Sequence, residues 1–152
     1  MAWSELDLDE GLWRLPAERN KSARPFDVPL SPPVVETLRA LPRIGPLVFA
    51  LDGKRPMAVH QLIDRVRRDA GLLDVRLHDL RRTLRTGLAE LGVSLEVAER
   101  VLNHAVPGLQ AVYNRHGYTA EKRAALARWA KHVIALAEKH EATIVAFRPA
   151  AA

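Results

Sequence analysis

Five side chains of this chain are of types that a reaction at a phosphodiester bond could use. His78 and Arg81 lie three residues apart in a stretch with helical periodicity, so they share one helix face. His104 ends a later predicted helix, Tyr113 follows it by nine residues, and Lys21 lies far upstream in a polar loop. They supply a phosphate-binding guanidinium, two imidazoles, a hydroxyl nucleophile and an ammonium general acid. This set predicts covalent chemistry at a phosphate.

Basic charge is concentrated in the second half of the chain. The sequence has a net charge of +5 and an isoelectric point near 10.1. Residues 1–75 contain 11 basic and 11 acidic residues, whereas residues 76–152 contain 12 basic and 7 acidic ones. The second half begins with RLHDLRRTLRTGLAELG, in which four arginines accompany a histidine. Such a surface attracts nucleic acid, acidic lipid or acidic protein, although the net charge alone would also fit ordinary solubility charge.

Composition excludes several other classes of site. The chain has no cysteine, which removes disulfides, thiol nucleophiles and cysteine-based zinc sites. The first residues, MAWSELDLDE, are acidic where a signal peptide is basic, and the apolar runs are too short to span a membrane. We therefore expect a cytoplasmic protein.

The sequence predicts an α+β fold in one domain, with a small antiparallel sheet followed by a helical bundle. Residues 1–30 alternate like strands in LDLD, LWRLPA and FDVPL, with the polar loop ERNKSARP between the second and the third. Residues 31–140 form the helical region, and residues 141–152 form a C-terminal tail. Helix starts are expected after Ser31, Ser94 and Thr119, and helix ends are expected at Gly71 and Gly92. A short piece opened by Pro107 is expected to carry the tyrosine.

The order of these motifs resembles the C-terminal catalytic part of the tyrosine recombinases, the phage-type integrases. The stretch LHDLRRTLRTGLAELGVSLEVAERVLNHAVPGLQAVYNRHGY contains HxxR, then LxH, then a tyrosine nine residues after that histidine. The stretch WSELDLDEGLWRLPAERNKSARPFDVPLS is similar to the β-sheet that precedes these motifs in the family, with a lysine in its hairpin. The resemblance runs from about residue 3 to about residue 135 and is closest to the integrases of prophages and genomic islands.

The resemblance implies a role for each of the five residues. Tyr113 would attack the scissile phosphate and form a 3′-phosphotyrosyl link, which stores the bond energy for rejoining. Arg81 and His104 would contact the non-bridging oxygens, where charge develops. His78 would act as an acid or base near the tyrosine, and Lys21 would protonate the leaving 5′-oxygen. The family uses no metal ion, so we expect no cofactor, and the expected partner is double-stranded DNA.

Simpler interpretations exist for several of these residues. A histidine at a helix end, such as His104, is usually a capping or surface residue, and Lys21 could be one charge among several in its loop. Tyr118 is a second hydroxyl close to Tyr113, but Tyr113 alone has the nine-residue spacing. Further arginines near the motifs are expected to contact the DNA backbone or solvent, namely Arg19, Arg24, Arg82, Arg85 and Arg115.

One catalytic residue of the family has no counterpart in the sequence. The family's first catalytic arginine lies on a helix upstream of the tryptophan that matches Trp3, in a segment like TGxRxxE. We therefore expect an artificially shortened integrase or a natural remnant, with an apolar patch exposed near Trp3 and Leu12. The expected function is site-specific DNA cleavage and joining, with little or no activity from this chain alone. The alternatives are a non-catalytic DNA-binding remnant and a type IB topoisomerase-like nickase.

The C-terminal tail offers a route to self-association. It contains the apolar run TIVAF, which needs cover from its own domain or from another protomer. The family often exchanges its last segment between protomers. A homo-oligomer formed through the tail is therefore one expectation, and docking of the tail on its own domain is the other.

Overall fold

An antiparallel sheet forms the N-terminal region, as the alternating pattern predicts. The structure is a computed structural model that describes residues 1–50, 52, 54–72, 74–104 and 117–145. The sheet has the order β1-β2-β3, with strands β1 (Leu6–Asp7), β2 (Leu12–Leu15) and β3 (Phe26–Pro29). The register pairs Leu6 with Trp13, and Trp13 with Val28. The loop between β2 and β3 is the one that carries Lys21.

Helices make up most of the remaining described chain, so the α+β expectation is confirmed. In chain order they are α1 (Pro32–Ala40), α2 (Val59–Ala70), α3 (Leu77–Glu90), α4 (Leu95–Val101) and α6 (Thr119–Val145). Short 3₁₀ turns cover Trp3–Glu5 and Ala17–Arg19. The piece expected after Pro107 lies outside the described residues.

The predicted helix boundaries have visible local causes. Ser31 occupies the N-cap position of α1 without a side-chain capping hydrogen bond, and prolines fill the first turn of that helix. Ser94 caps α4 with a side-chain oxygen that accepts from the Val97 amide at 3.4 Å. Gly71 ends α2 with φ +66°, a left-handed conformation that glycine adopts without strain. α6 runs on to Val145, so part of the expected tail is helical.

Two apolar clusters stabilise the fold. The first lies between the sheet and α1 around Leu30, Leu38 and Val48, with Trp3 and Trp13 packed against it. The expected apolar patch near Trp3 and Leu12 is not exposed. Leu12 is buried, and the Trp3 ring is half-buried with the Arg43 guanidinium above it, 4.6 Å from the ring centroid. Strand pairing and the chain around Val48 cover these side chains.

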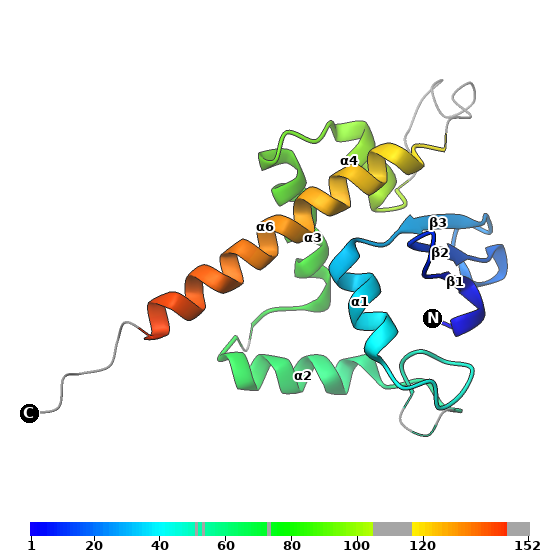
Figure 1. The fold of residues 1–152 in the computed structure, drawn as a ribbon, viewed down its shortest axis with the longest axis horizontal. Coiled ribbons are helices and arrows are strands. Elements are labelled where there is room, and N and C mark those ends of the chain that lie inside the picture. Colours follow the sequence, from blue (N-terminus) through cyan, green and yellow to red (C-terminus); the bar gives the residue numbers. More distant parts are fainter. Residues whose placement is uncertain (51, 53, 73, 105–116, 146–152) are drawn as a thin grey trace, which may run out of the picture.

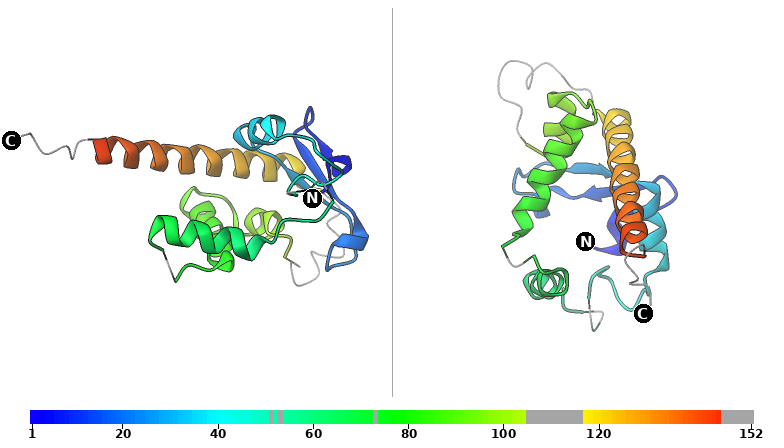
Figure 2. Two further views of the ribbon diagram at one scale, coloured as in Figure 1. Left: turned by 90° about the horizontal axis from the view of Figure 1, so that it is seen from below. Right: turned by 90° about the vertical axis from the view of Figure 1, so that its left-hand side faces the viewer.

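The second cluster joins α3, α4 and α6. Leu88, Ala98 and Ala125 are buried together, with Trp129 packed against them. Figure 1 shows α6 crossing α3 and α4, while the sheet and α1 lie beside its N-terminal half. In the left view of Figure 2 the C-terminal half of α6 extends beyond the other elements. None of the described helices combines the length and the apolar character that crossing a bilayer requires.

Candidate active site

The N-terminal end of α3 presents the predicted HxxR pair. The side chain of Asp79 accepts a hydrogen bond from the Arg76 amide at 2.8 Å, which closes the first turn of the helix. His78 is exposed and Arg81 is half-buried. Because the two residues are one helical turn apart, both lie on the face that turns toward the end of α4.

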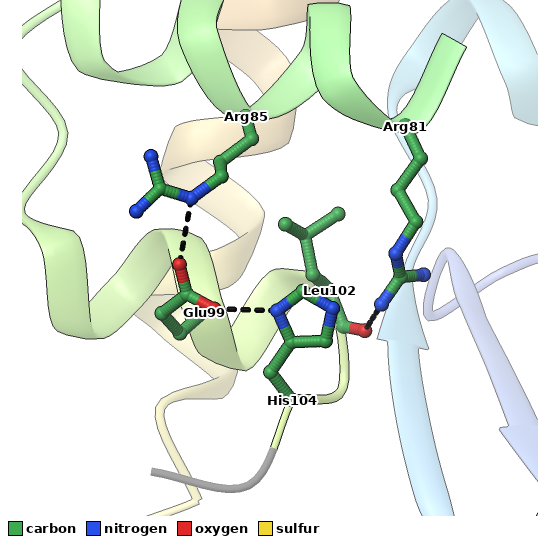
Figure 3. Close-up of polar contacts among 5 residues, drawn as sticks. All are labelled: Arg81, Arg85, Glu99, Leu102 and His104. Carbon is green, nitrogen blue, oxygen red and sulfur yellow. Dashed lines mark hydrogen bonds and ion pairs between the residues drawn. The ribbon is translucent and has the colours of Figure 1, made fainter. Parts of the chain in front are cut away.

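Arg81 is anchored to the end of α4. Its Nη2 donates a hydrogen bond to the main-chain oxygen of Leu102, the buried residue that follows α4 (Figure 3). A guanidinium has five N–H donors. Among the described residues, the Arg81 guanidinium makes no other hydrogen bond. The anchored group therefore keeps donors for an anion.

His104 and Arg85 meet at one carboxylate. In Figure 3, Glu99 of α4 lies between them, with its Oε2 2.5 Å from His104 Nδ1 and its Oε1 2.8 Å from Arg85 Nε. The hydrogen bond from His104 lowers the pKa of the Glu99 carboxyl below its usual range, burial opposes this shift, and Arg85 adds to it. Arg85, which the sequence assigns to DNA or solvent, thus has a partner within the protein, and its contact with DNA stays a prediction.

The contact with Glu99 determines what the other ring nitrogen of His104 can do. An ionised carboxylate accepts hydrogen bonds and does not donate them, so Nδ1 must carry the proton of the shared bond. In the neutral ring Nε2 then holds a lone pair, and only the imidazolium has a second N–H. A donor role for His104 toward a phosphate oxygen therefore requires the protonated ring.

A cleft of 580 Å³ brings three of the predicted residues together. Its lining consists of Asn20, Lys21, Ser22, His78, Arg81, Leu102 and Asn103. Lys21, His78 and Arg81 come from the β2–β3 loop and from α3, which are separated by more than fifty residues in the sequence. His104 lines a neighbouring cavity of 390 Å³, and Asn103 lies in the wall of both. The fold thus places Lys21, His78, Arg81 and His104 around residues 102–104, the turn that follows α4.

Tyr113 and Arg115 lie outside the described residues. Tyr118 is described, and its hydroxyl donates to Glu96 Oε1 at 2.7 Å. The Arg100 guanidinium lies over its ring, 3.9 Å from the centroid. This hydroxyl already has an acceptor, and that arrangement is typical of a structural tyrosine.

The other arginines that are predicted to contact DNA differ in how strongly partners within the protein hold them. Arg82 is largely exposed and lies 3.5 Å from Asp79, an ion pair that water and salt weaken. Arg24 is exposed on the β2–β3 loop, where its main-chain oxygen accepts from Asn20. Arg19 forms an ion pair with Glu5, whose carboxylate also accepts from the indole of Trp13 at 3.0 Å. Arg82 and Arg24 are therefore better placed for DNA than Arg19.

Lys122 is a buried charge that the sequence analysis did not identify. It is only 4% exposed, and its Nζ donates to the main-chain oxygen of Asp27 at 2.7 Å and lies 4.7 Å from the Phe26 ring centroid. Burial lowers the pKa of this ammonium, the charge of Asp27 opposes the shift, and Arg100 adds to it. The lysine ties the start of α6 to β3. A sequence gives little signal for such a contact, because a lysine on a helix is usually exposed.

Comparisons with known proteins show the family of this chain. The profile of the phage integrase family matches residues 1–120. The chain is similar to prophage integrase IntZ of Escherichia coli (strain K12), with 31% identity over 133 residues, which is 84% of this chain and 33% of IntZ. It is equally similar to prophage integrase IntA of the same strain, with 31% identity over 135 residues, 84% of this chain and 32% of IntA. The chain thus spans about a third of the length of these relatives. No solved structure matches it.

Proposed function

The chain belongs to the phage integrase family, and we propose that it acts in site-specific recombination by cutting and rejoining DNA through a phosphotyrosyl link. The observation that carries this proposal is the cleft that joins Lys21, His78 and Arg81. Each of these side chains suits a different part of one phosphoryl transfer. Charged side chains that serve only solubility would not be expected to gather in one cleft.

The proposed step exchanges one phosphodiester for another. The Tyr113 hydroxyl attacks phosphorus, its proton passes to His78, and the bond between phosphorus and the 5′-oxygen breaks. Lys21 gives a proton to the departing 5′-oxygen, so a free 5′-hydroxyl and a 3′-phosphotyrosine result. Rejoining is the reverse step and needs no external energy source or cofactor.

Arg81 and His104 would stabilise the charge that develops on the non-bridging oxygens. Arg81 is already anchored by the Leu102 oxygen, so little reorganisation is needed when the phosphate arrives. His104 would donate from Nε2 as the imidazolium, with Glu99 as the acceptor on its other side. The family pattern shares this charge between two arginines, whereas among the residues that the structure describes Arg81 is the one arginine in the lining of the cleft. We therefore expect slow cleavage, because one missing donor reduces the rate about 100- to 1000-fold.

The test is a nicked DNA duplex that loses its short 5′-hydroxyl fragment after cleavage, so that the covalent complex cannot rejoin. Mass spectrometry of the digested complex should find DNA on Tyr113. Tyr113→Phe should abolish trapping, and Tyr118→Phe is the matched control because its hydroxyl is bonded to Glu96. An adduct on Tyr118 would overturn the nucleophile assignment. Salt-sensitive DNA binding without any adduct would favour a non-catalytic DNA-binding role.

Self-association through the end of the chain is a second part of the proposal. The C-terminal half of α6 carries exposed apolar side chains, namely Val133, Ile134 and Leu136. Contact with another protomer would cover this face. Sedimentation of the chain with and without residues 141–152 tests the idea, and a monomer in both samples would remove it.

A further inference from the structure

The loop that carries Lys21 is braced by the side chain beside it. Asn20 begins a tight turn in which the Ala23 amide donates to the Asn20 main-chain oxygen at 2.9 Å. The Asn20 side chain donates from Nδ2 to the Arg24 oxygen at 2.7 Å and accepts at Oδ1 from the Ser22 amide at 3.4 Å. Lys21 therefore occupies the middle of a turn whose two ends are tied together.

Asn103 occupies the turn that follows α4. Its amide donates to the Arg100 oxygen at 3.2 Å, and the next amide, that of His104, donates to the Glu99 oxygen at 2.9 Å. With φ +54° at Asn103, this is a Schellman ending, in which the left-handed position is usually glycine. Asparagine tolerates this conformation and, unlike glycine, presents an amide group.

That amide reaches the Lys21 turn. Asn103 Nδ2 donates to Asn20 Oδ1 at 3.1 Å, which connects segments 83 positions apart in the sequence. The orientation of both amides follows from the network. Asn20 must place Nδ2 toward the Arg24 oxygen and Oδ1 toward the Ser22 amide, so Asn103 can only meet it as a donor.

We infer that Asn103 is a positioning residue that acts through Asn20 to hold Lys21 over the scissile phosphate, an inference that rests on the proposed function. The turn 102–104 then organises three groups at once. The Leu102 oxygen holds Arg81, the Asn103 amide holds the lysine loop, and His104 itself projects from the turn toward Glu99. Lys21 has a long side chain on an exposed loop, so fixing the turn beneath it reduces the conformations that its ammonium must search.

A substrate with a sulfur leaving group distinguishes a role of Asn103 in positioning Lys21 from a general role in stabilising the fold. When sulfur replaces the bridging 5′-oxygen, the departing thiolate is a weak base that needs no proton, since a thiol ionises near about pH 8.5. Lys21→Ala should slow trapping on the oxygen substrate on the order of 100- to 10,000-fold and should be nearly normal on the sulfur substrate. Asn103→Gly keeps the left-handed turn and removes the amide. It should slow the oxygen reaction roughly ten- to a hundredfold and should likewise recover on sulfur.

Glu99→Gln is the matched control, because it changes the side-chain partner of His104, which belongs to the same turn. It should slow both substrates alike, since the imidazole acts on the non-bridging oxygens. Equal slowing of Asn103→Gly on oxygen and sulfur would show that Asn103 does not act through the general acid, and would overturn the inference.

A second measurement does not depend on cleavage. Amide ¹⁵N relaxation of residues 20–24 should show lower order parameters in Asn103→Gly than in the wild type, with little change in Glu99→Gln. Unchanged order in Asn103→Gly would overturn the inference even if cleavage were impaired. If the wild type traps neither substrate, the proposed function fails, and the relaxation data alone decide whether Asn103 orders the loop.

Discussion

Arg81 illustrates how a single residue is prepared for an anion before one binds. A free arginine would have to give up several rotamers on meeting a phosphate, which opposes binding. Here the bond to the Leu102 oxygen fixes the guanidinium in advance, and it does so with an acceptor that belongs to the turn beside His104.

Arg81→Lys is expected to reduce the trapping rate about 100- to 1000-fold, because a lysine keeps the charge and loses the planar fork. Arg82→Lys is the control, since Arg82 is exposed and has only a surface ion pair with Asp79. Single-turnover trapping on the nicked duplex gives both rates. Thermal melting of each variant separates lost chemistry from lost folding. Equal rates for the two variants would remove the special role of Arg81.

Residue types and spacing predict which side chains gather, and they do so through local rules. HxxR places two groups on one helix face, and a histidine at a helix end is recognisable in the sequence. The supporting contacts follow no such rule. Asn20 with Asn103 and Lys122 with Asp27 are pairs separated by 83 and 95 positions, so only the folded chain reveals them.

At the level of elements, the site depends on how closely α3 and α6 approach. Gly87 of α3 is buried at this crossing, and a Cβ built there would lie 2.1 Å from Trp129 Cζ3. The glycine therefore makes room for the indole. Hydrophobic periodicity predicts both helices, but it does not predict which residue of one faces which residue of the other.

Gly87→Ala is expected to destabilise the protein by up to about 2 kcal/mol. Alanine favours a helix over glycine by about 1 kcal/mol, but overpacking against the indole costs about 1–3 kcal/mol and exceeds that gain. Thr86→Ala, at the exposed neighbouring position, should be neutral or stabilising. Urea unfolding measures both variants.

A second substitution tests the cause of that loss. Trp129→Leu should destabilise the Gly87→Ala background less than it destabilises the wild type, because the smaller side chain removes the clash. Additive effects would mean that the indole is not what Gly87 accommodates.

At the level of the whole molecule, acid stability reflects carboxylates that join separate parts of the chain. Glu5, Glu96 and Glu99 all have a pKa below the ordinary value of 4.5, and the partners of each include groups from other elements. Burial would raise the pKa of Glu5, and its hydrogen bonds outweigh that effect, whereas in Glu96 and Glu99 a hydrogen bond is the largest cause. The folded state thus binds fewer protons than the unfolded state in this pH range.

Above about pH 5 these three groups should not change the free energy of unfolding, because they are ionised in both the folded and the unfolded state. The free energy of unfolding should fall as the pH drops below 4.5 and through their lower folded pKa values. Urea midpoints at several pH values measure it. Glu99→Gln should show a smaller acid-induced loss than the wild type, since one of the three groups no longer titrates. The same acid-induced loss in both proteins would show that Glu99 does not contribute.

The basic second half of the chain gives the last whole-molecule prediction, which concerns DNA binding. If α3 and the β2–β3 loop face the duplex, binding releases counterions, and the logarithm of the affinity should fall with the logarithm of salt by roughly 0.9 for each phosphate contacted. Arg82→Ala and Arg24→Ala should each reduce this slope by about 0.9. Arg39→Ala should leave it unchanged, because Arg39 lies on α1 and pairs with Asp9 at 2.8 Å. All three variants change the net charge by the same amount. If the arginines serve only solubility, the three variants should therefore have the same salt slope. That result, or a slope near zero for the wild type, would place the DNA on another face of the protein or exclude direct binding.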